Sequence, residues 1–297
     1  MGIGNKPIDG GNYLFTAEEK IAFLKTEPKA AQYFHPWYGS YEFIHNEPRY
    51  CLWLGDCSPH ELREMPQCLK RVAAVRDFRL ASKSEGTRKI ADKPTRFHVE
   101  NMPKGDFILV PSTSSENREY VPIGFLPPDI IASNATTIVP SATLYHFGIL
   151  TSSVHMAWMR AVAGRLKSDY RYSANIVYNN FPWPEGDNGT NGTTGTDATG
   201  TTATIDGASH SSRQSHMSHD LCAAISSTAQ AILDARANYP DASLADLYDP
   251  LTMPPDLRAA HAANDRAVLA AYGLAPGTPE SEIVAHLFRL YAEATAK

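Results

Sequence analysis

The chain has 297 residues, a length that suits two domains, and 43% of them are hydrophobic, enough to build a sizeable core. Because it contains no run of about 18 apolar residues and does not begin like a signal peptide, the sequence predicts neither a membrane span nor a secreted protein. A net charge of −5 argues against general affinity for nucleic acids, and four cysteines in so long a chain favour free thiols in a reducing, cytoplasmic setting.

The first half of the chain predicts a mixture of helices and strands. Thr16 and Glu19 have the spacing of a capping box, which opens a short helix. Residues 59–79 and 152–164 have apolar residues at helical spacing. Strands rich in β-branched and aromatic residues are predicted at 50–54, 107–111, 120–125 and 136–139.

A composition change divides the chain after residue 185. Residues 186–217 are rich in Gly, Thr and Ser, which predicts a flexible linker or insertion. Residues 218–297 show helical spacing at 220–239 and 256–272, and Thr278-Pro279-Glu280 is typical of a helix start with Thr278 as N-cap. The predicted fold is therefore α+β: a mixed sheet-and-helix domain over 1–185, followed by a small all-α domain over 218–297.

Charge is distributed unevenly over these parts. Residues 1–185 carry 21 Lys and Arg against 19 Asp and Glu, whereas residues 186–297 carry 6 against 13. Residues 70–104 hold ten basic and four acidic residues, an excess that can bind phosphates but that also suits a solvated surface. If the segment binds DNA, the expected phosphate contacts are Arg79, Lys83, Arg88, Lys89 and Arg96.

Two kinds of catalytic or metal chemistry are conceivable. Cys51, Cys57, His60 and Cys68 could bind zinc, but they lack paired C-x-x-C spacing, and packed thiols explain them as well. For a hydrolase, His35 is the first candidate, yet no G-x-S-x-G elbow is present. The sequence predicts no catalytic residue and no metal site.

Residues 164–173 contain the most informative pattern. Lysine can donate to guanine O6 and N7, aspartate can accept from cytosine N4, and arginine can bind guanine or phosphate. If the segment is extended, Lys167, Asp169 and Arg171 point to one face, because alternate residues of a strand share a face. Lys167 and Asp169 could then contact the two bases of one G·C pair. A salt-bridge ladder on the surface is the alternative explanation.

Long runs of the chain resemble the C-terminal portion of MmeI-like bifunctional restriction-modification enzymes, which join nuclease, adenine methyltransferase and target recognition in one chain. The resemblance covers nearly all of the sequence outside residues 186–217. The matching runs are IGNKPIDGGNYLF, HPWYGSYEFI, RYCLWLGDCSP, VRDFRLASKS, TRFHVENMP, PIGF, SATLYHFGILTSSVHMAWMRAVAGRLKSDYRYSANIVYNNFPWP and TAQAILDARANYPDASLADLYDPLTMPPDLRAAHAANDRAV.

The resemblance implies a DNA target-recognition domain over 1–185 and a C-terminal helical domain over 218–297 that packs beside it on DNA. In the family, residues that contact bases cluster in two segments. Their matches in this sequence are Lys167, Asp169 and Arg171 in one segment, and Asn134 and Ala135 in the other.

The family's methyltransferase and nuclease motifs have no match in the sequence, which implies a C-terminal fragment of a longer enzyme. The motif Asn-Pro-Pro-aromatic is approached by Asn180-Phe181-Pro182, but Phe181 interrupts it. The expected partners are double-stranded DNA and the methyltransferase and nuclease domains of the parent chain. The parent, not this fragment, would use S-adenosylmethionine to methylate adenine. An independent metal- or serine-dependent hydrolase and a protein-interaction module are the alternatives.

Overall fold

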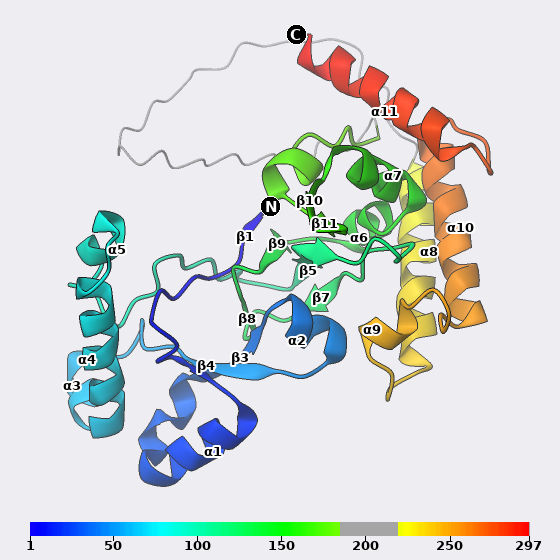
Figure 1. Cartoon of the computed structure of the whole chain (residues 1–297). Coiled ribbons are helices and arrows are strands. Elements are labelled where there is room, and N and C mark those ends of the chain that lie inside the picture. Colours follow the sequence, from blue (N-terminus) through cyan, green and yellow to red (C-terminus); the bar gives the residue numbers. More distant parts are fainter. Residues whose placement is uncertain (185–218, 297) are drawn as a thin grey trace.

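The computed structural model describes residues 1–184 and 219–296, and its architecture confirms the predicted α+β class (Figure 1). The described part of residues 1–184 contains three small sheets with helices around them, whereas residues 219–296 form helices joined by loops. None of the helices in these two ranges is long and apolar enough to cross a membrane. The prediction of a flexible linker over 186–217 lies outside the described residues.

An aromatic core surrounds the first sheet, whose strand order is β2-β4-β3-β8. Strand β3 pairs in parallel with β8 and antiparallel with β4. The predicted capping box is confirmed before helix α1: the Glu19 amide donates to Thr16 Oγ1 at 3.2 Å, and the Thr16 amide donates to the Glu19 carboxylate at 2.8 Å. The elements here are β2 (Leu14–Phe15), α1 (Ala17–Thr26), a 3₁₀ helix (Pro28–Tyr33), β3 (Phe34–Tyr38), α2 (Ser40–His45), β4 (Arg49–Leu52) and β8 (Ile131–Ala132).

The central sheet is antiparallel, with the order β1-β9-β5-β7. Strand β5 is the predicted strand 107–111 and is buried throughout, which explains its continuous apolar sequence. The predicted strand 120–125 is correct only at its end, because Pro122 has no N–H to donate to a ladder and the strand begins at Gly124. The strands are β1 (Gly2–Ile3), β5 (Phe107–Pro111), β7 (Gly124–Leu126) and β9 (Thr136–Pro140).

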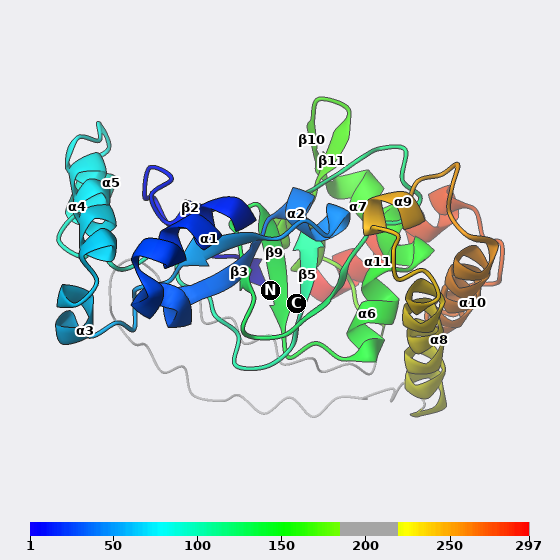
Figure 2. The same ribbon diagram turned by 90° about the horizontal axis from the view of Figure 1, so that it is seen from below.

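Three helices project from one end of the molecule (Figures 1 and 2). The helical pattern over 59–79 forms two helices because Pro66 cannot donate an intrahelical hydrogen bond and disfavours helical geometry in the residue before it. Their bounds are α3 (Pro59–Arg63), α4 (Pro66–Leu80) and α5 (Glu85–Lys89).

The C-terminal helices share one hydrophobic core with the central sheet and the helices that follow it. At Gly148 a Cβ would lie 2.7 Å from the Ile225 side chain, so glycine permits α6 and α8 to approach closely. Helix α11 begins at Glu280, so the prediction that Thr278 is its N-cap is wrong; the Thr278 hydroxyl donates to the Ala275 carbonyl instead. The helices are α6 (Leu144–Leu150), α7 (Ser153–Val162), α8 (His219–Ala237), α9 (Leu244–Leu247), α10 (Pro255–Ala271) and α11 (Glu280–Thr295).

Candidate nucleic-acid interface

The segment after α7 is a β-hairpin. Strands β10 (Gly164–Leu166) and β11 (Asp169–Arg171) pair antiparallel around the two-residue turn Lys167-Ser168, and β11 also pairs with β6 (Thr113–Ser114). Lys167 has a φ of 57°, the left-handed conformation that such tight turns require. The expectation of one extended segment over these residues is therefore wrong.

The hairpin has two different faces. Asp169 and Arg171 share one face, as predicted from their spacing, and Arg171 is exposed. On the opposite face Tyr170 is buried, and the Arg165 guanidinium lies 3.7 Å from its ring centroid. Lys167 is exposed in the turn, so its side chain extends from the tip of the hairpin and not from the face that carries Asp169 and Arg171.

Asn134 and Ala135 occupy the turn between β8 and β9. The Thr136 amide donates to the Ser133 carbonyl at 3.0 Å, which closes the turn and leaves both residues exposed. The Ala135 carbonyl accepts hydrogen bonds from the Ser112 amide at 3.2 Å and from the Ser40 hydroxyl at 2.6 Å.

The structure brings the two predicted base-contacting segments together through residues 112–113. The Ser112 amide donates to the Ala135 carbonyl, and the Ser112 carbonyl accepts from the Tyr172 amide at 2.9 Å. The next residue, Thr113, pairs with Arg171 across the ladder. The turn at Ala135 and the base of the hairpin are thus neighbours, although 36 positions separate Ala135 from Arg171 in the sequence.

Three of the predicted phosphate contacts are exposed on helix α5 and the turn before it. The Arg88 guanidinium donates to the Ser82 and Lys83 carbonyls at 2.8 and 2.9 Å, which fixes the turn between α4 and α5. Lys89 forms an exposed ion pair with Glu85 at 2.9 Å. We call residues 66–89 the basic arm.

The prediction that Arg79 contacts phosphate is wrong. Its side chain is 0% exposed, and its five N–H groups donate to five backbone carbonyls at 2.8–2.9 Å, so no donor remains for a ligand. Arg96 is exposed but already forms an ion pair with Glu100 at 2.8 Å. The carbonyls that Arg79 binds belong to Pro7, Ile8, Ile90, Lys93 and Arg96.

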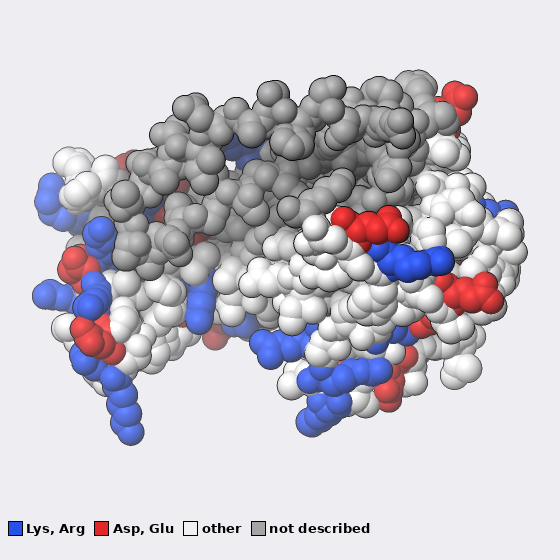
Figure 3. Space-filling view, turned by 90° about the horizontal axis from the view of Figure 1, so that it is seen from above, with Lys and Arg blue, Asp and Glu red and all other residues white. Residues whose placement is uncertain are grey.

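The basic arm and the hairpin project to the same side of the molecule (Figure 2). In the space-filling view the surface between the two projections is hollowed, and Lys and Arg side chains stand on both of them (Figure 3). A groove flanked by positive charge attracts a polyanion, because the charges act together over the surface between them.

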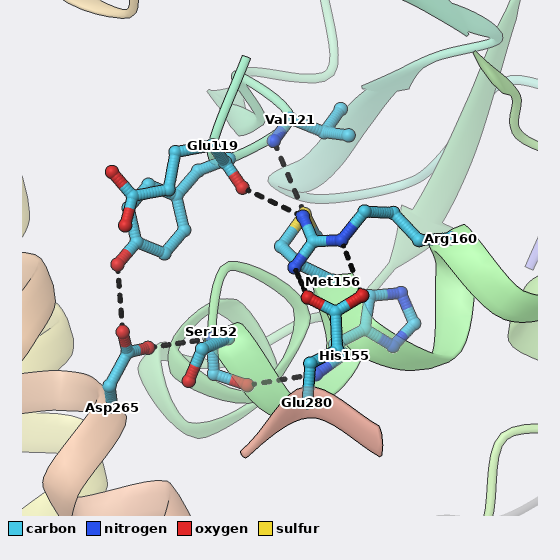
Figure 4. A network of polar contacts seen from close by, with 10 residues as sticks. Glu119, Val121, Ser152, His155, Met156, Arg160, Asp265 and Glu280 are labelled. Atoms are coloured by element: carbon cyan, nitrogen blue, oxygen red, sulfur yellow. Dashed lines mark hydrogen bonds and ion pairs between the residues drawn. The ribbon is translucent and has the colours of Figure 1, made fainter. Parts of the chain in front are cut away.

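Contacts with the C-terminal helices hold α7, the helix that precedes the hairpin (Figure 4). The Asp265 carboxylate, on α10, accepts from the Ser153 amide at 2.6 Å and from the Tyr120 hydroxyl at 2.7 Å. Ser153 is the first residue of α7, and the same helix contains His155. A hydrogen bond of 2.9 Å joins His155 Nε2 to the hydroxyl of Tyr172, the residue that follows β11.

Arg160 at the other end of α7 forms a bidentate ion pair with Glu280 on α11, with distances of 2.9 and 2.8 Å. The Arg160 guanidinium also donates to the Glu119 carbonyl at 3.3 Å. Both ends of α7 are therefore attached to C-terminal helices, and α7 leads directly into β10.

The alternative chemistries gain no support from the described residues. Among residues 1–184 and 219–296, no group of three or more His, Cys, Asp or Glu side chains is placed to hold a metal ion. Cys51 and Cys68 are buried, and burial raises the pKa of the Cys68 thiol to about 12. Phe181 is buried and packs edge-on against the His155 ring, with 4.5 Å between the ring centroids. The NFPWP segment therefore contributes to the hydrophobic core.

Comparison with known proteins agrees with a DNA-binding region followed by a helical region. The family described as "MmeI, target recognition domain" matches residues 1–185, and "MmeI, C-terminal domain" matches residues 218–297. DNA methyltransferase A of Bacillus subtilis (strain 168) is 36% identical over 294 residues, which are 99% of this chain and 30% of that protein.

A solved structure of the type IIL restriction-modification enzyme MmeI in complex with DNA is also similar, with a TM-score of 0.87 and 42% identity. It covers 100% of this chain, which covers 35% of the MmeI chain. The chain thus spans about a third of the length of both relatives. These matches show that the chain belongs to the MmeI family and carries that family's target recognition domain and C-terminal domain.

Proposed function

We propose that this chain recognises a specific sequence of double-stranded DNA on behalf of a larger restriction-modification methyltransferase. The observation that supports it most is that the exposed turn Asn134-Ala135 lies beside the base of the hairpin, and that this hairpin projects to the same side of the molecule as the basic arm. In this proposal residues 1–185 are the recognition domain, residues 218–297 are a helical support, and residues 186–217 link them.

The parent enzyme would methylate adenine at N6, with S-adenosylmethionine bound outside this chain. The name of the Bacillus relative supports DNA methylation by the parent, and the partial coverage of both relatives supports a parent longer than this chain. Adenine as the target and S-adenosylmethionine as the cofactor rest on the resemblance to MmeI-like enzymes. The partners of this chain are then duplex DNA and the methyltransferase and nuclease domains of the parent, and the chain has no catalytic centre of its own.

Base recognition would divide between the hairpin and the Asn134-Ala135 turn. Lys167 only donates and Asp169 only accepts, so together they fit one G·C pair in one orientation, lysine toward guanine and aspartate toward cytosine. Arg171 would contact a base of the neighbouring pair, together with Asn134 and Ala135. The small side chain of Ala135 leaves room for this contact in the groove. Lys83, Arg88 and Lys89 would contact phosphates, with Arg96 joining if it exchanges Glu100 for a phosphate.

The test begins with selection of duplexes from a random pool by the chain, followed by the exchange Lys167→Glu with Asp169→Arg. We expect the exchanged protein to prefer C·G where the original prefers G·C, whereas each single change loses about 1–3 kcal/mol at that pair without a new preference. The conservative change Glu116→Gln affects an ion pair with Arg165 at 3.5 Å, on the face of the hairpin opposite Asp169, and should leave the selected sequence unaltered.

A selected sequence that is unchanged in the exchanged protein would refute the pairing. Equal loss of affinity for every duplex would favour the surface salt-bridge ladder. Failure of the chain to bind any duplex would contradict the proposed function itself and favour a protein-interaction module.

A further inference from the structure

Leu166 is a large apolar side chain exposed on the hairpin, close to its tip. It is 55% exposed, although leucine is among the residues that proteins bury most often. Its neighbours Lys167 and Ser168 form the turn and are exposed as well, at the end of the hairpin that projects to the same side as the basic arm (Figure 2). A single exposed leucine is ordinary on a protein surface. A leucine that lies among residues that contact a ligand, however, becomes buried against that ligand when it binds.

The register places Leu166 on the same face as the proposed base contacts. Leu166 and Asp169 are directly opposite each other in the ladder, and Gly164 is opposite Arg171. Directly opposed residues of antiparallel strands have Cβ atoms about 4.5–5.5 Å apart on one face. Arg165 belongs to the other face, where it covers Tyr170, so the two hairpin strands present on this face an aliphatic side chain, a carboxylate and a guanidinium.

Gly164 also favours close approach along this face. A Cβ at Gly164 would meet no atom of the described residues within 4 Å, so none of these residues fills the space beside Gly164. The ribbon can therefore lie flat against a surface, with Leu166 and Asp169 touching it at adjacent points.

We propose that Leu166 contacts the C5-methyl group of a thymine in the major groove, in the base pair next to the one bound by Asp169. The inference rests on the proposed function of the hairpin. The major groove accepts a two-stranded ribbon, and the thymine methyl is the apolar group that base edges present there. Because leucine neither donates nor accepts hydrogen bonds, its contact favours thymine over cytosine by burial of apolar surface alone.

Insertion of Leu166 between base pairs fits the geometry less well. Side chains in a strand stand roughly perpendicular to the sheet, so Leu166 points out of the face of the ribbon and not beyond its end. Asp169 on the same face would have to leave its base edge for Leu166 to enter the stack.

The test pairs a methyl deletion in the DNA with a side-chain truncation in the protein. After selection of the preferred duplex, each thymine in it is replaced singly by deoxyuridine, which removes the methyl and keeps every hydrogen-bonding group. For one position we expect about a fourfold rise in Kd with the original protein, the value of one buried methyl-sized group. Leu166→Ala should bind the thymine duplex several-fold more weakly and show no further loss on the deoxyuridine duplex.

Leu251→Ala is the matched control, because Leu251 is 95% exposed but lies in the loop between α9 and α10. It should show the same fourfold sensitivity to deoxyuridine as the original protein. Independent, additive losses for Leu166→Ala and deoxyuridine would overturn the inference, as would a selected site without thymine beside the Asp169 pair.

Equal weakening of Leu166→Ala on all duplexes, with increased 2-aminopurine fluorescence on binding of the original protein, would show insertion into the stack and also overturn it. In all these cases the original protein still selects a sequence, so the proposed function stands. If the original protein selects no sequence, the proposed function fails and the inference fails with it.

Discussion

Arg79 shows how differently two basic residues of one segment can behave. Its guanidinium is buried and all five of its N–H groups donate to carbonyls, which join α4 to the N-terminal segment and to the loop after α5. We expect Arg79→Ala to lower the free energy of unfolding by about 3–5 kcal/mol, because five carbonyls lose a charged donor in a buried site. Urea denaturation measures this.

Lys83→Ala, at an exposed position of the same arm, provides the control and should change stability by less than about 0.5 kcal/mol. A stable Arg79→Ala protein that binds DNA weakly would instead assign Arg79 to phosphate contact, contrary to the structure.

Two buried histidines make stability depend on pH. Burial lowers the pKa of His155 and of His261 to about 3, compared with about 6.5 when unfolded. Between these two pKa values the unfolded chain binds more protons than the folded chain. The stability that the neutral buried histidines contribute is therefore fully present above pH 6.5. It declines as the pH falls toward 3, by about 1.4 kcal/mol per pH unit for each histidine. Urea denaturation from pH 7 to 5 should show this slope, and His155→Gln should remove half of it. A slope that does not change in this variant would contradict the burial of a neutral His155.

At the scale of one element, the residue in the hairpin turn affects the free energy of unfolding and DNA recognition in opposite directions. Lys167 adopts a left-handed conformation that costs a non-glycine residue about 1 kcal/mol. Lys167→Gly should therefore raise the free energy of unfolding by up to about 1 kcal/mol and yet reduce discrimination at the G·C pair. Thermal denaturation and competition with altered duplexes measure the two effects. A glycine variant with unchanged discrimination would remove Lys167 from the recognition surface.

The basic arm should contribute salt-dependent affinity without sequence preference. Each side chain that neutralises a phosphate should steepen the fall of log K with log salt by about 0.9. Lys83→Gln with Lys89→Gln, which spares the Arg88 hydrogen bonds that fix the turn, should therefore make that slope shallower by about 1.8 and leave the selected sequence unchanged. Titrations at several salt concentrations decide this; an unaltered slope would place the arm away from DNA.

At the scale of the whole molecule, the C-terminal helices act on the recognition hairpin through α7. Burial raises the pKa of Asp265, while its hydrogen bonds from Ser153 and Tyr120 oppose that shift. Asp265→Asn should lower the free energy of unfolding by about 1–3 kcal/mol, because an amide cannot accept with both terminal atoms. It should also relax discrimination at the pair bound by Arg171, since the root of the hairpin loosens. Loss of stability with unchanged discrimination would limit these helices to a supporting role.

The sequence by itself determined the α+β class, the helical C-terminal part and the segments that contain the candidate base contacts. Local signals suffice for the first two features: the Thr16 capping box and the continuous apolar run of β5 depend on near neighbours in the chain. For the candidate base contacts, the alternation of Asp169 with Arg171 is a local signal, whereas the segment with Asn134 and Ala135 came only from the resemblance to the family.

The tertiary structure alone decided which charges face solvent and how the hairpin turns. Lys-Ser lacks the Asn-Gly signature of a tight turn, so the hairpin at Lys167 forms because β11 pairs with β6 and Tyr170 is buried, not because of local preference. Arg79 resembles its exposed neighbours in the sequence, and only the carbonyls that surround it, from residues up to 72 positions away, make it a core residue. Contacts between distant segments carry no local pattern, which is why the sequence could not separate these cases.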